Sequence, residues 1–255
     1  MIKKLFLSVV IVLVVLIVVA VIVAGFFLGT IVKTGMETVG PKITQVSIKV
    51  DAVKLTLLNG SAQVKGLVVG NPEGYKTPQA INVGSADVDL NPFSVLSDKI
   101  VIRSVRVEAP EITFEGNPFS GNNLSAIMKN VNAATKGGGP GSMNAATKPG
   151  QAGKKIEVDD FLITGAKVHV SLSGIGGKEM TLPLPDIHLT NLGKDKNGIT
   201  AADLTRRVLD TITTATIKAV ANATTDIGTG AGKAAGEGMN KITPGIGGLF
   251  KKSTN

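Results

Sequence analysis

An uncharged apolar run from Leu5 to Val32, directly after Lys3 and Lys4, constrains this chain more than any other feature. As a helix, the part from Leu5 to Phe27 would be about 34 Å long, enough for the ~30 Å hydrocarbon core of a bilayer. A cleaved signal peptide has an apolar stretch of only ~7–15 residues. We therefore expect an uncleaved transmembrane anchor over residues 5–32. Its anchor residues are Leu5, Val9, Leu13, Leu16, Val19, Val23 and Phe27.

The orientation of this anchor follows less directly from charge. Lys3 and Lys4 precede the run, but Lys33 and Lys42 follow it, so the positive-inside rule gives only a small bias. The very short N-terminus favours residues 1–4 as a cytoplasmic stub. We therefore expect a single-pass protein of the inner membrane, with most of the chain in the periplasm of a Gram-negative host.

After residue 44 the apolar residues recur with a period of two, which is typical of β-strands. The pattern changes parity near Ala52-Val53, which predicts a β-bulge there. Asn59-Gly60 predicts a tight hairpin turn. The next strand ends at a turn motif formed by Gly70, Asn71, Pro72 and Gly74. Further segments with strand character are 80–90, 100–109, 111–115, 156–163, 166–172, 180–184 and 187–189.

The rest of the chain divides by composition. We expect residues 33–134 to be the first part of a β domain that ends in a short helix begun at Asn123, and residues 155–192 to be its second part. The segment 135–154 is rich in Gly and predicts a flexible linker. Thr200 and Asp203 match a capping box and begin an amphipathic helix over 199–227, and a flexible Gly-rich tail follows over 228–255.

Residues that carry catalysis or bind metals are scarce. The chain has no Cys and two His, both on polar faces of their strands. Asp159 and Asp160 are adjacent in a strand and point to opposite faces, so they do not form a metal site. The segment 228–233 only superficially resembles a phosphate-binding loop, because Ala234 stands where Ser or Thr would coordinate magnesium. We expect no enzyme activity and no cofactor.

The net charge of +8 has three interpretations. Nucleic-acid binding is disfavoured because aromatic residues for base stacking are few, at 4%. The charge instead suits a domain held near anionic lipid head groups. Binding of another anionic polymer through this charge is a third and weaker functional hypothesis. Strong salt dependence of binding would reveal it.

The strands and turns also resemble a known family. The relevant segments are 58–75, which contains Gly70-Asn71-Pro72-Glu73-Gly74, then 87–90, 100–112 and 121–124. Together they resemble the AsmA-like superfamily of bacterial envelope proteins, over roughly residues 1–190. The resemblance implies a folded-over, β-taco-like sheet with an apolar inner groove. It also implies a part in outer-membrane biogenesis or in phospholipid handling, with phospholipid in the groove.

The expected fold is therefore mainly β, with an N-terminal transmembrane helix, an antiparallel folded-over sheet, a short helix and a C-terminal amphipathic helix. About nine strands spaced ~4.8 Å apart would extend only ~43 Å, too short to cross the periplasm, which favours an inner-membrane module with an envelope protein partner. A tethered sandwich with a closed core, like the water-stress type of late-embryogenesis protein, remains an alternative that binds no lipid. The candidate groove residues are Val46, Ile48, Val50, Val88, Ile102, Val168, Val170 and Leu172.

Overall fold

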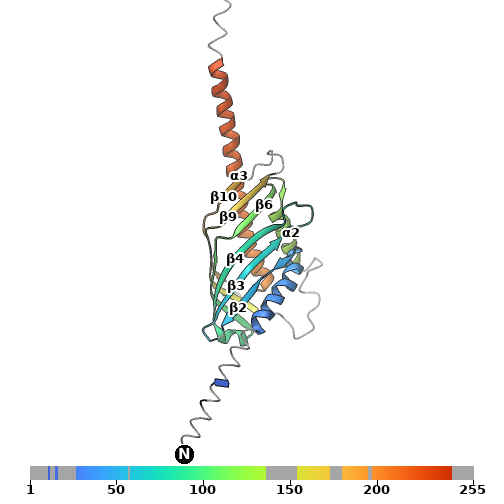
Figure 1. Cartoon of the computed structure of the whole chain (residues 1–255), viewed down its shortest axis with the longest axis vertical. Coiled ribbons are helices and arrows are strands. Elements are labelled where there is room, and N and C mark those ends of the chain that lie inside the picture. The colour runs from blue at the N-terminus through green and yellow to red at the C-terminus, as the bar shows by residue number, and fades with distance from the viewer. Residues whose placement is uncertain are drawn as a thin grey trace, which may run out of the picture.

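Figure 1 presents the computed structural model of the chain, which describes residues 11, 15–16, 27–56, 58–135, 154–172, 180–194 and 197–242. For Leu172 and residues 226–242, it describes the backbone only. Among the helices within these ranges, none is both long and apolar enough to cross a membrane. Parts of the predicted linker over 135–154 and of the predicted tail over 228–255 lie outside them. So does most of the predicted anchor, including Leu5, Val9, Leu13, Val19 and Val23.

The structure confirms a mainly β fold, in which one sheet is accompanied by three α-helices within the described ranges. The helices are one that occupies residues 27–44, α2 (Asn123–Thr135) and α3 (Ala201–Ile242), with a short 3₁₀ helix η1 (Pro92–Leu96). The strands are β1 (Ile48–Lys49), β2 (Ala52–Thr56), β3 (Ser61–Gly70), β4 (Gln79–Leu90), β5 (Lys99–Glu108), β6 (Glu111–Asn117), β7 (Gly121–Asn122), β8 (Lys155–Thr164), β9 (Lys167–Leu172), β10 (Met180–Pro183) and β11 (Ile187–Leu192).

The prediction of a purely antiparallel sheet was wrong, because the sheet is mixed. β5 pairs with β8 in parallel, and β6 pairs with β9 in parallel. Two parallel strands need a long crossover between them rather than a hairpin. Here α2 and the segment after it lie between β7 and β8, so the chain returns to the start of β5 before β8 begins. The remaining pairings are antiparallel.

Several labelled strands are two halves of one long strand. β5 and β6 pair with β4 in an unbroken register, since Val107 lies opposite Ala86 and Glu111 opposite Asn82. In the same way β8 continues into β9, β10 into β11, and β1 into β2. Apart from β7, the sheet therefore consists of six long strands and is about 24 Å wide at a spacing of ~4.8 Å.

A crease crosses all six long strands at one level. Between the buried Val107 and Pro110, the two consecutive residues Glu108 and Ala109 are exposed. Before this pair one set of alternate residues faces inward, and after it the other set does. The registers place the same change of parity in the neighbouring strands directly beside this one. The residues that lie opposite one another along the crease are Asp51, Gly66, Gly84, Ala109, Gly165 and Pro185.

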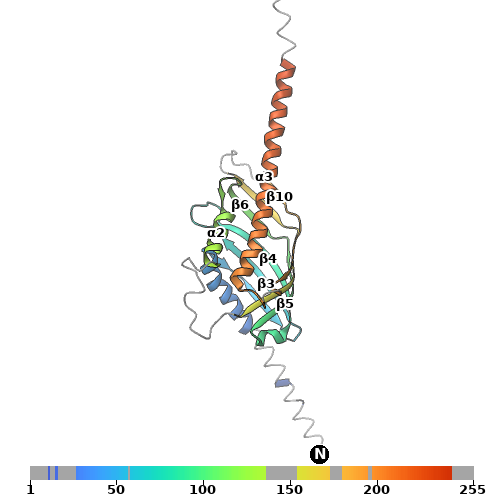
Figure 2. The ribbon, with the colours of Figure 1, turned by 180° about the vertical axis from the view of Figure 1, so that it is seen from behind.

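Backbone conformation explains the crease. Gly66, Ala109 and Gly165 have φ angles of 61°, 46° and 64°, in the left-handed region that interrupts the pleat. The Ala109 N–H donates to the Thr164 carbonyl over 2.8 Å, so pairing continues across the interruption. Because neighbouring strands change parity at the same level, each strand bends while it stays hydrogen-bonded to its neighbours, and the sheet folds over (Figures 1 and 2). The predicted change of parity near Ala52 is therefore confirmed, but the predicted β-bulge there was wrong, because the pairing with β3 keeps one register from Ile48 to Thr56.

Local signals at two other places are confirmed. Thr56 pairs with Ser61 across the Asn59-Gly60 turn, and Gly60 has a φ of 73°. Thr200 caps α3, since its hydroxyl accepts from the Asp203 N–H over 3.0 Å. However, α3 reaches Ile242, so residues 228–242 are helical and not part of a flexible tail. Once a helix has formed, each further residue is added at low cost, and Ala, Lys, Glu and Met between the glycines favour its extension.

Candidate functional site

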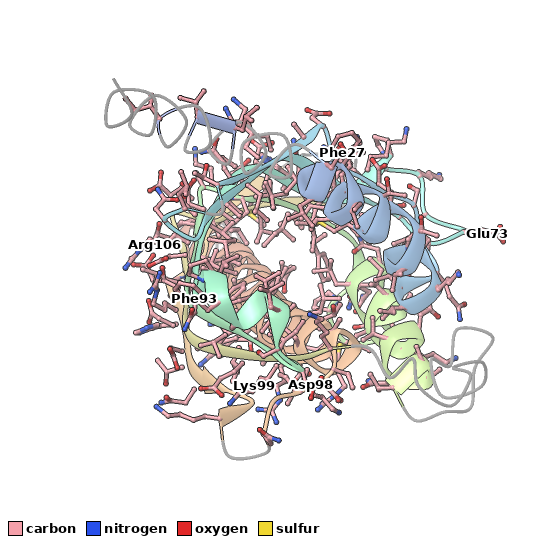
Figure 3. The ribbon with its side chains drawn as sticks, turned by 90° about the horizontal axis from the view of Figure 1, so that it is seen from below. Phe27, Glu73, Phe93, Asp98, Lys99 and Arg106 are labelled. Atoms are coloured by element: carbon pink, nitrogen blue, oxygen red, sulfur yellow. The ribbon has the colours of Figure 1, made fainter. Side chains whose placement is uncertain are left out.

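The inside of the folded sheet holds a cavity of about 630 Å³. It lies between the concave face of the sheet, the helix over residues 27–44 and the first turns of α3. Figure 3 looks along the molecule from below and shows the sheet curling round, with these helices on the open side. The volume lies in the ~300–1,000 Å³ range of small-molecule sites.

The crease forms the floor of this cavity. In two of the long strands, β5–β6 and β8–β9, inward-facing residues on both sides of the parity change contribute side chains to it, and the other long strands contribute from one side. Val107 and Pro110 flank the crease in one long strand, and Ile163 and Ala166 flank it in the next. The sheet residues that line the cavity are Ile48, Leu67, Val69, Ile81, Val83, Val107, Pro110, Ile112, Phe161, Ile163, Ala166 and Ile187.

The two helices form the roof. Gly35 and Gly40 carry no side chain, and the flexible thioether of Met36 adapts to irregular space. A Cβ atom on Gly35 would meet nothing within 4 Å. Helix residues that line the cavity are Gly35, Met36, Val39, Gly40, Ile43 and Thr44 from 27–44, and Ala201, Leu204, Thr205, Val208, Leu209 and Ile212 from α3.

The chemistry of the lining is almost entirely apolar. Among the described residues of the lining, polar side chains come from Thr44, Thr205 and Lys154 alone. The Thr44 hydroxyl donates to the Gly40 carbonyl over 2.9 Å, and the Lys154 ammonium donates to the Val95 carbonyl of η1. In the part of the chain that the structure describes, no carboxylate and no imidazole lines the cavity. Such a surface can hold a hydrocarbon ligand, but it brings together no acid–base pair.

The cavity reaches the surface beside η1. Lys154 and Ala201 are exposed lining residues, one just before β8 and the other at the first position of α3. Both lie at the end of the sheet where β5 begins. The Lys155 N–H donates to the Asp98 carbonyl over 3.0 Å, and Ile199, just before α3, pairs with Ile156 at the start of β8. An apolar ligand could therefore enter there, with its polar group beside the Lys154 ammonium.

The candidate groove residues predicted from the alternation are distributed over several environments. Ile48 lines the cavity. Val46, Val168 and Val170 are buried in the main hydrophobic core, and Val50 is also buried. Val88 is half-buried, and the backbone of Leu172, at the end of β9, pairs with Gly116 of β6. Ile102 packs on a second, smaller cluster formed by Val158, Leu192 and Ile199.

Sequence reasoning missed most of the lining, because its candidate residues came from only one side of the parity change in each strand. Beyond the crease the opposite parity faces inward. The signal was present as two adjacent non-core residues inside an apolar strand, such as Glu108-Ala109 and Thr164-Gly165. The roof residues could not be recognised, because nothing local shows that residues 27–44 cover the sheet.

The turn motif at Gly70, Asn71, Pro72 and Gly74 lies away from the cavity, in a buried polar network. The Asn71 side chain donates to the Thr77 carbonyl over 2.8 Å and accepts from the Asn123 amide over 2.8 Å. Asn123 is fully buried and also donates to the Thr113 carbonyl over 2.7 Å. The motif therefore joins the end of β3 to the start of α2, which is a structural role.

Glu115 completes this network. Burial raises the pKa of Glu115, but hydrogen bonds from the Thr77 hydroxyl and from the backbone N–H groups of Lys76 and Thr77 outweigh it, so the pKa lies below its usual value. These bonds measure 2.6, 2.7 and 2.8 Å. The ionised form is therefore the one that the fold stabilises.

Glu37 joins the helix over 27–44 to the sheet. Its carboxylate accepts from the Val50 N–H over 3.0 Å and pairs with Lys33 over 3.2 Å. These contacts, with the backbone bond first, lower the pKa of Glu37. The roof helix is thereby held against the strand at the crease.

Comparison with models of known protein families and with curated proteins finds no match to this chain. The resemblance to AsmA-like proteins consequently remains a prediction. In the part of the chain that the structure describes, no group of three or more His, Cys, Asp or Glu side chains could hold a metal ion.

Proposed function

We propose that this chain is a non-enzymatic, membrane-anchored protein of the bacterial envelope that holds hydrocarbon chains of phospholipid in the cavity over the crease. The observation that carries the proposal is the cavity itself, with a volume of about 630 Å³ and only three polar side chains in its lining. Empty apolar space of this size is costly in a folded protein, because its lining lacks contacts with either protein or ligand.

The membrane location rests on the sequence. The uncharged run over 5–32 supports a single-pass anchor in the inner membrane, with residues from about 33 onward in the periplasm. The described helix over residues 27–44 includes the last residues of this run and forms part of the cavity roof. The helix over residues 27–44 would therefore connect the anchor directly to the lipid site.

The width of the sheet supports action at one membrane. The six long strands make a sheet about 24 Å wide, which is narrower than a sheet of nine separate strands would be. We propose that the chain handles phospholipid during outer-membrane biogenesis next to the inner membrane and exchanges it with an envelope partner, in the manner of AsmA-like proteins.

The test is to purify the full chain in mild detergent and to quantify co-purifying lipid by mass spectrometry. The informative variant is the double substitution Val39→Phe and Val208→Phe, which fills the cavity from both roof helices. We expect about one or two phospholipids per wild-type chain and at least a tenfold loss in the double variant. Thr214→Phe, at an exposed position of the same helix α3, is the matched control and should retain lipid.

Two outcomes would contradict the proposal. A wild-type chain that unfolds cooperatively but carries no phospholipid would favour the alternative of a closed interaction module. Equal amounts of lipid in the wild type and in the filled variant would show that the lipid binds outside the cavity. Circular dichroism of every variant establishes that lost lipid does not reflect lost folding.

A further inference from the structure

Three large apolar side chains project into solvent at one end of the sheet. Leu58 is 70% exposed in the turn between β2 and β3, and Phe93 and Leu96 are 83% and 88% exposed on η1. We call these three residues the basal tip. Two separate connections contribute to it, so the exposure is not a property of one loop.

The two connections of the basal tip are held together. The Leu90 N–H donates to the Gly60 carbonyl over 2.8 Å, and a Cβ atom on Gly60 would lie 2.0 Å from the Leu90 carbonyl oxygen. The turn that carries Leu58 therefore packs directly against the strand end that leads into η1. The relative position of the three apolar side chains is set by backbone contact.

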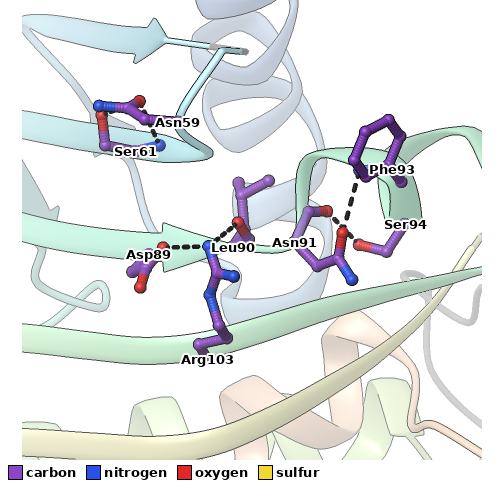
Figure 4. A network of polar contacts seen from close by, with 8 residues as sticks. All are labelled: Asn59, Ser61, Asp89, Leu90, Asn91, Phe93, Ser94 and Arg103. Atoms are coloured by element: carbon purple, nitrogen blue, oxygen red, sulfur yellow. Dashed lines mark hydrogen bonds and ion pairs between the residues drawn. The ribbon is translucent and has the colours of Figure 1, made fainter.

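Several polar groups around the basal tip have hydrogen-bond partners within the protein, as Figure 4 shows. The Asn91 side chain accepts from the Phe93 N–H over 3.1 Å, and the Arg103 guanidinium donates to the Leu90 carbonyl over 2.9 Å. Asn59 likewise accepts from the Ser61 N–H over 3.1 Å. Polar groups that leave water for a lipid interface need hydrogen-bond partners within the protein, because hydrocarbon offers none.

The basal tip lies at the same end as the start of the described helix over 27–44 (Figure 1). A Cβ atom on Gly29 would lie 2.3 Å from the carbonyl oxygen of Val53, in the strand that runs toward Leu58. Phe27 and Ile31 on this helix are exposed as well. The chain before them is uncharged and apolar back to Leu5, so the apolar run leaves the domain from this end.

Basic side chains accompany the basal tip. Lys154 and Lys155 are exposed beside η1, and neither forms an ion pair with a residue that the structure describes. The Lys154 ammonium also lies at the mouth of the cavity. Cations next to exposed apolar side chains suit an anionic lipid surface.

We propose that Leu58, Phe93 and Leu96 insert into the interface of the same bilayer that holds residues 5–32. This inference rests on the membrane anchoring in the proposed function, but not on the ligand of the cavity. Insertion of the basal tip places the mouth at Lys154 against the lipid surface, so a lipid chain could pass between bilayer and cavity without crossing water.

The chain has no Cys, so single-cysteine variants can be labelled without background. The full chain is reconstituted into vesicles of phosphatidylethanolamine and phosphatidylglycerol that contain brominated lipid, with a bimane label at Leu58→Cys, Phe93→Cys or Leu96→Cys. Phe119→Cys is the matched control, because Phe119 is 77% exposed but follows β6, at the far end of the long strand that β5 begins beside η1. We expect at least threefold stronger quenching at the basal tip than at Phe119.

The possible outcomes separate the two proposals. Quenching at the basal tip no stronger than at Phe119, in chains that float with the vesicles, would overturn membrane insertion and would indicate a protein partner for this patch. Chains that do not float would overturn the anchor and the tip together. Strong quenching at the tip in a chain that carries no lipid in its cavity would support this inference and contradict only the ligand of the proposed function.

Discussion

At the scale of single residues, buried polar side chains hold the fold where its long connections meet. Glu115 and Asn123 join the turn after β3 to the start of α2, and each has its hydrogen-bonding groups paired. Such networks are costly when one member is lost, because a donor is then buried without a partner.

Glu115 gives the fold a dependence on pH. Its pKa is lowered in the folded state, so its contribution to the free energy of unfolding is present above the unfolded value near 4.5 and is lost as the pH falls through the folded pKa. Glu115→Gln turns an amide donor toward Thr77 and should cost about 1–3 kcal/mol at pH 7. Urea unfolding followed by circular dichroism measures this, and the difference from the wild type should shrink below pH 4.5.

The matched control for this prediction is Glu73→Gln, at an exposed position in the same turn. It should leave the free energy of unfolding unchanged within about 0.5 kcal/mol. A difference between Glu115→Gln and the wild type that stays constant from pH 7 to pH 3 would contradict the role given to the ionised carboxylate.

Backbone strain along the crease is also a residue property. Ala109 has a φ of 46°, a conformation that costs a non-Gly residue roughly 1–2 kcal/mol. Ala109→Gly should therefore stabilise the fold by up to about 1 kcal/mol, after the entropy of the unfolded glycine is subtracted. Gly165→Ala, with a φ of 64° beside it, should destabilise by roughly 1–2 kcal/mol. Melting temperatures that shift in the same direction in both variants would refute this account.

At the scale of elements, the helix over 27–44 is placed by close approach to the sheet. Gly29 faces the backbone of β2, whereas Gly35 faces open cavity. The two glycines therefore have different reasons to lack a side chain, although both lie on one helix.

Alanine substitution should separate these two glycines. Gly29→Ala would bring a methyl group against the Val53 carbonyl, push the helix from β2 and lower the melting temperature. Gly35→Ala should raise stability by up to about 1 kcal/mol through helix propensity. Thermal unfolding of both variants in detergent is the measurement, and equal effects would show that the helix does not contact β2 at Gly29.

At the scale of the whole molecule, the arrangement places several functions at one end. The start of the helix over 27–44, the basal tip and the mouth of the cavity at Lys154 all lie where β5 and β8 begin, whereas α3 extends past the opposite end (Figures 1 and 2). The lipid analysis and the quenching experiment both address this arrangement. Lipid in the cavity and lipid at the tip are independent findings, and together they would define a site that loads directly from the bilayer.

Local sequence patterns determined the features that depend on near neighbours. The alternation of apolar residues predicts strands, Asn59-Gly60 predicts its hairpin, and Thr200 with Asp203 predicts the start of α3, because each signal reflects hydrogen bonds or pleating within a few residues. The parity change near Ala52 was visible for the same reason.

Only the tertiary structure decided the parallel pairing of β5 with β8, the alignment of Gly66, Ala109 and Gly165 in one crease, and the cover of the sheet by residues 27–44. These features depend on which distant segments lie side by side, and a parity change in one strand does not show whether its neighbours share it. When the neighbours share it, the strands bend together and enclose a cavity. The apolar alternation of each strand therefore could not show which of its residues would line that space.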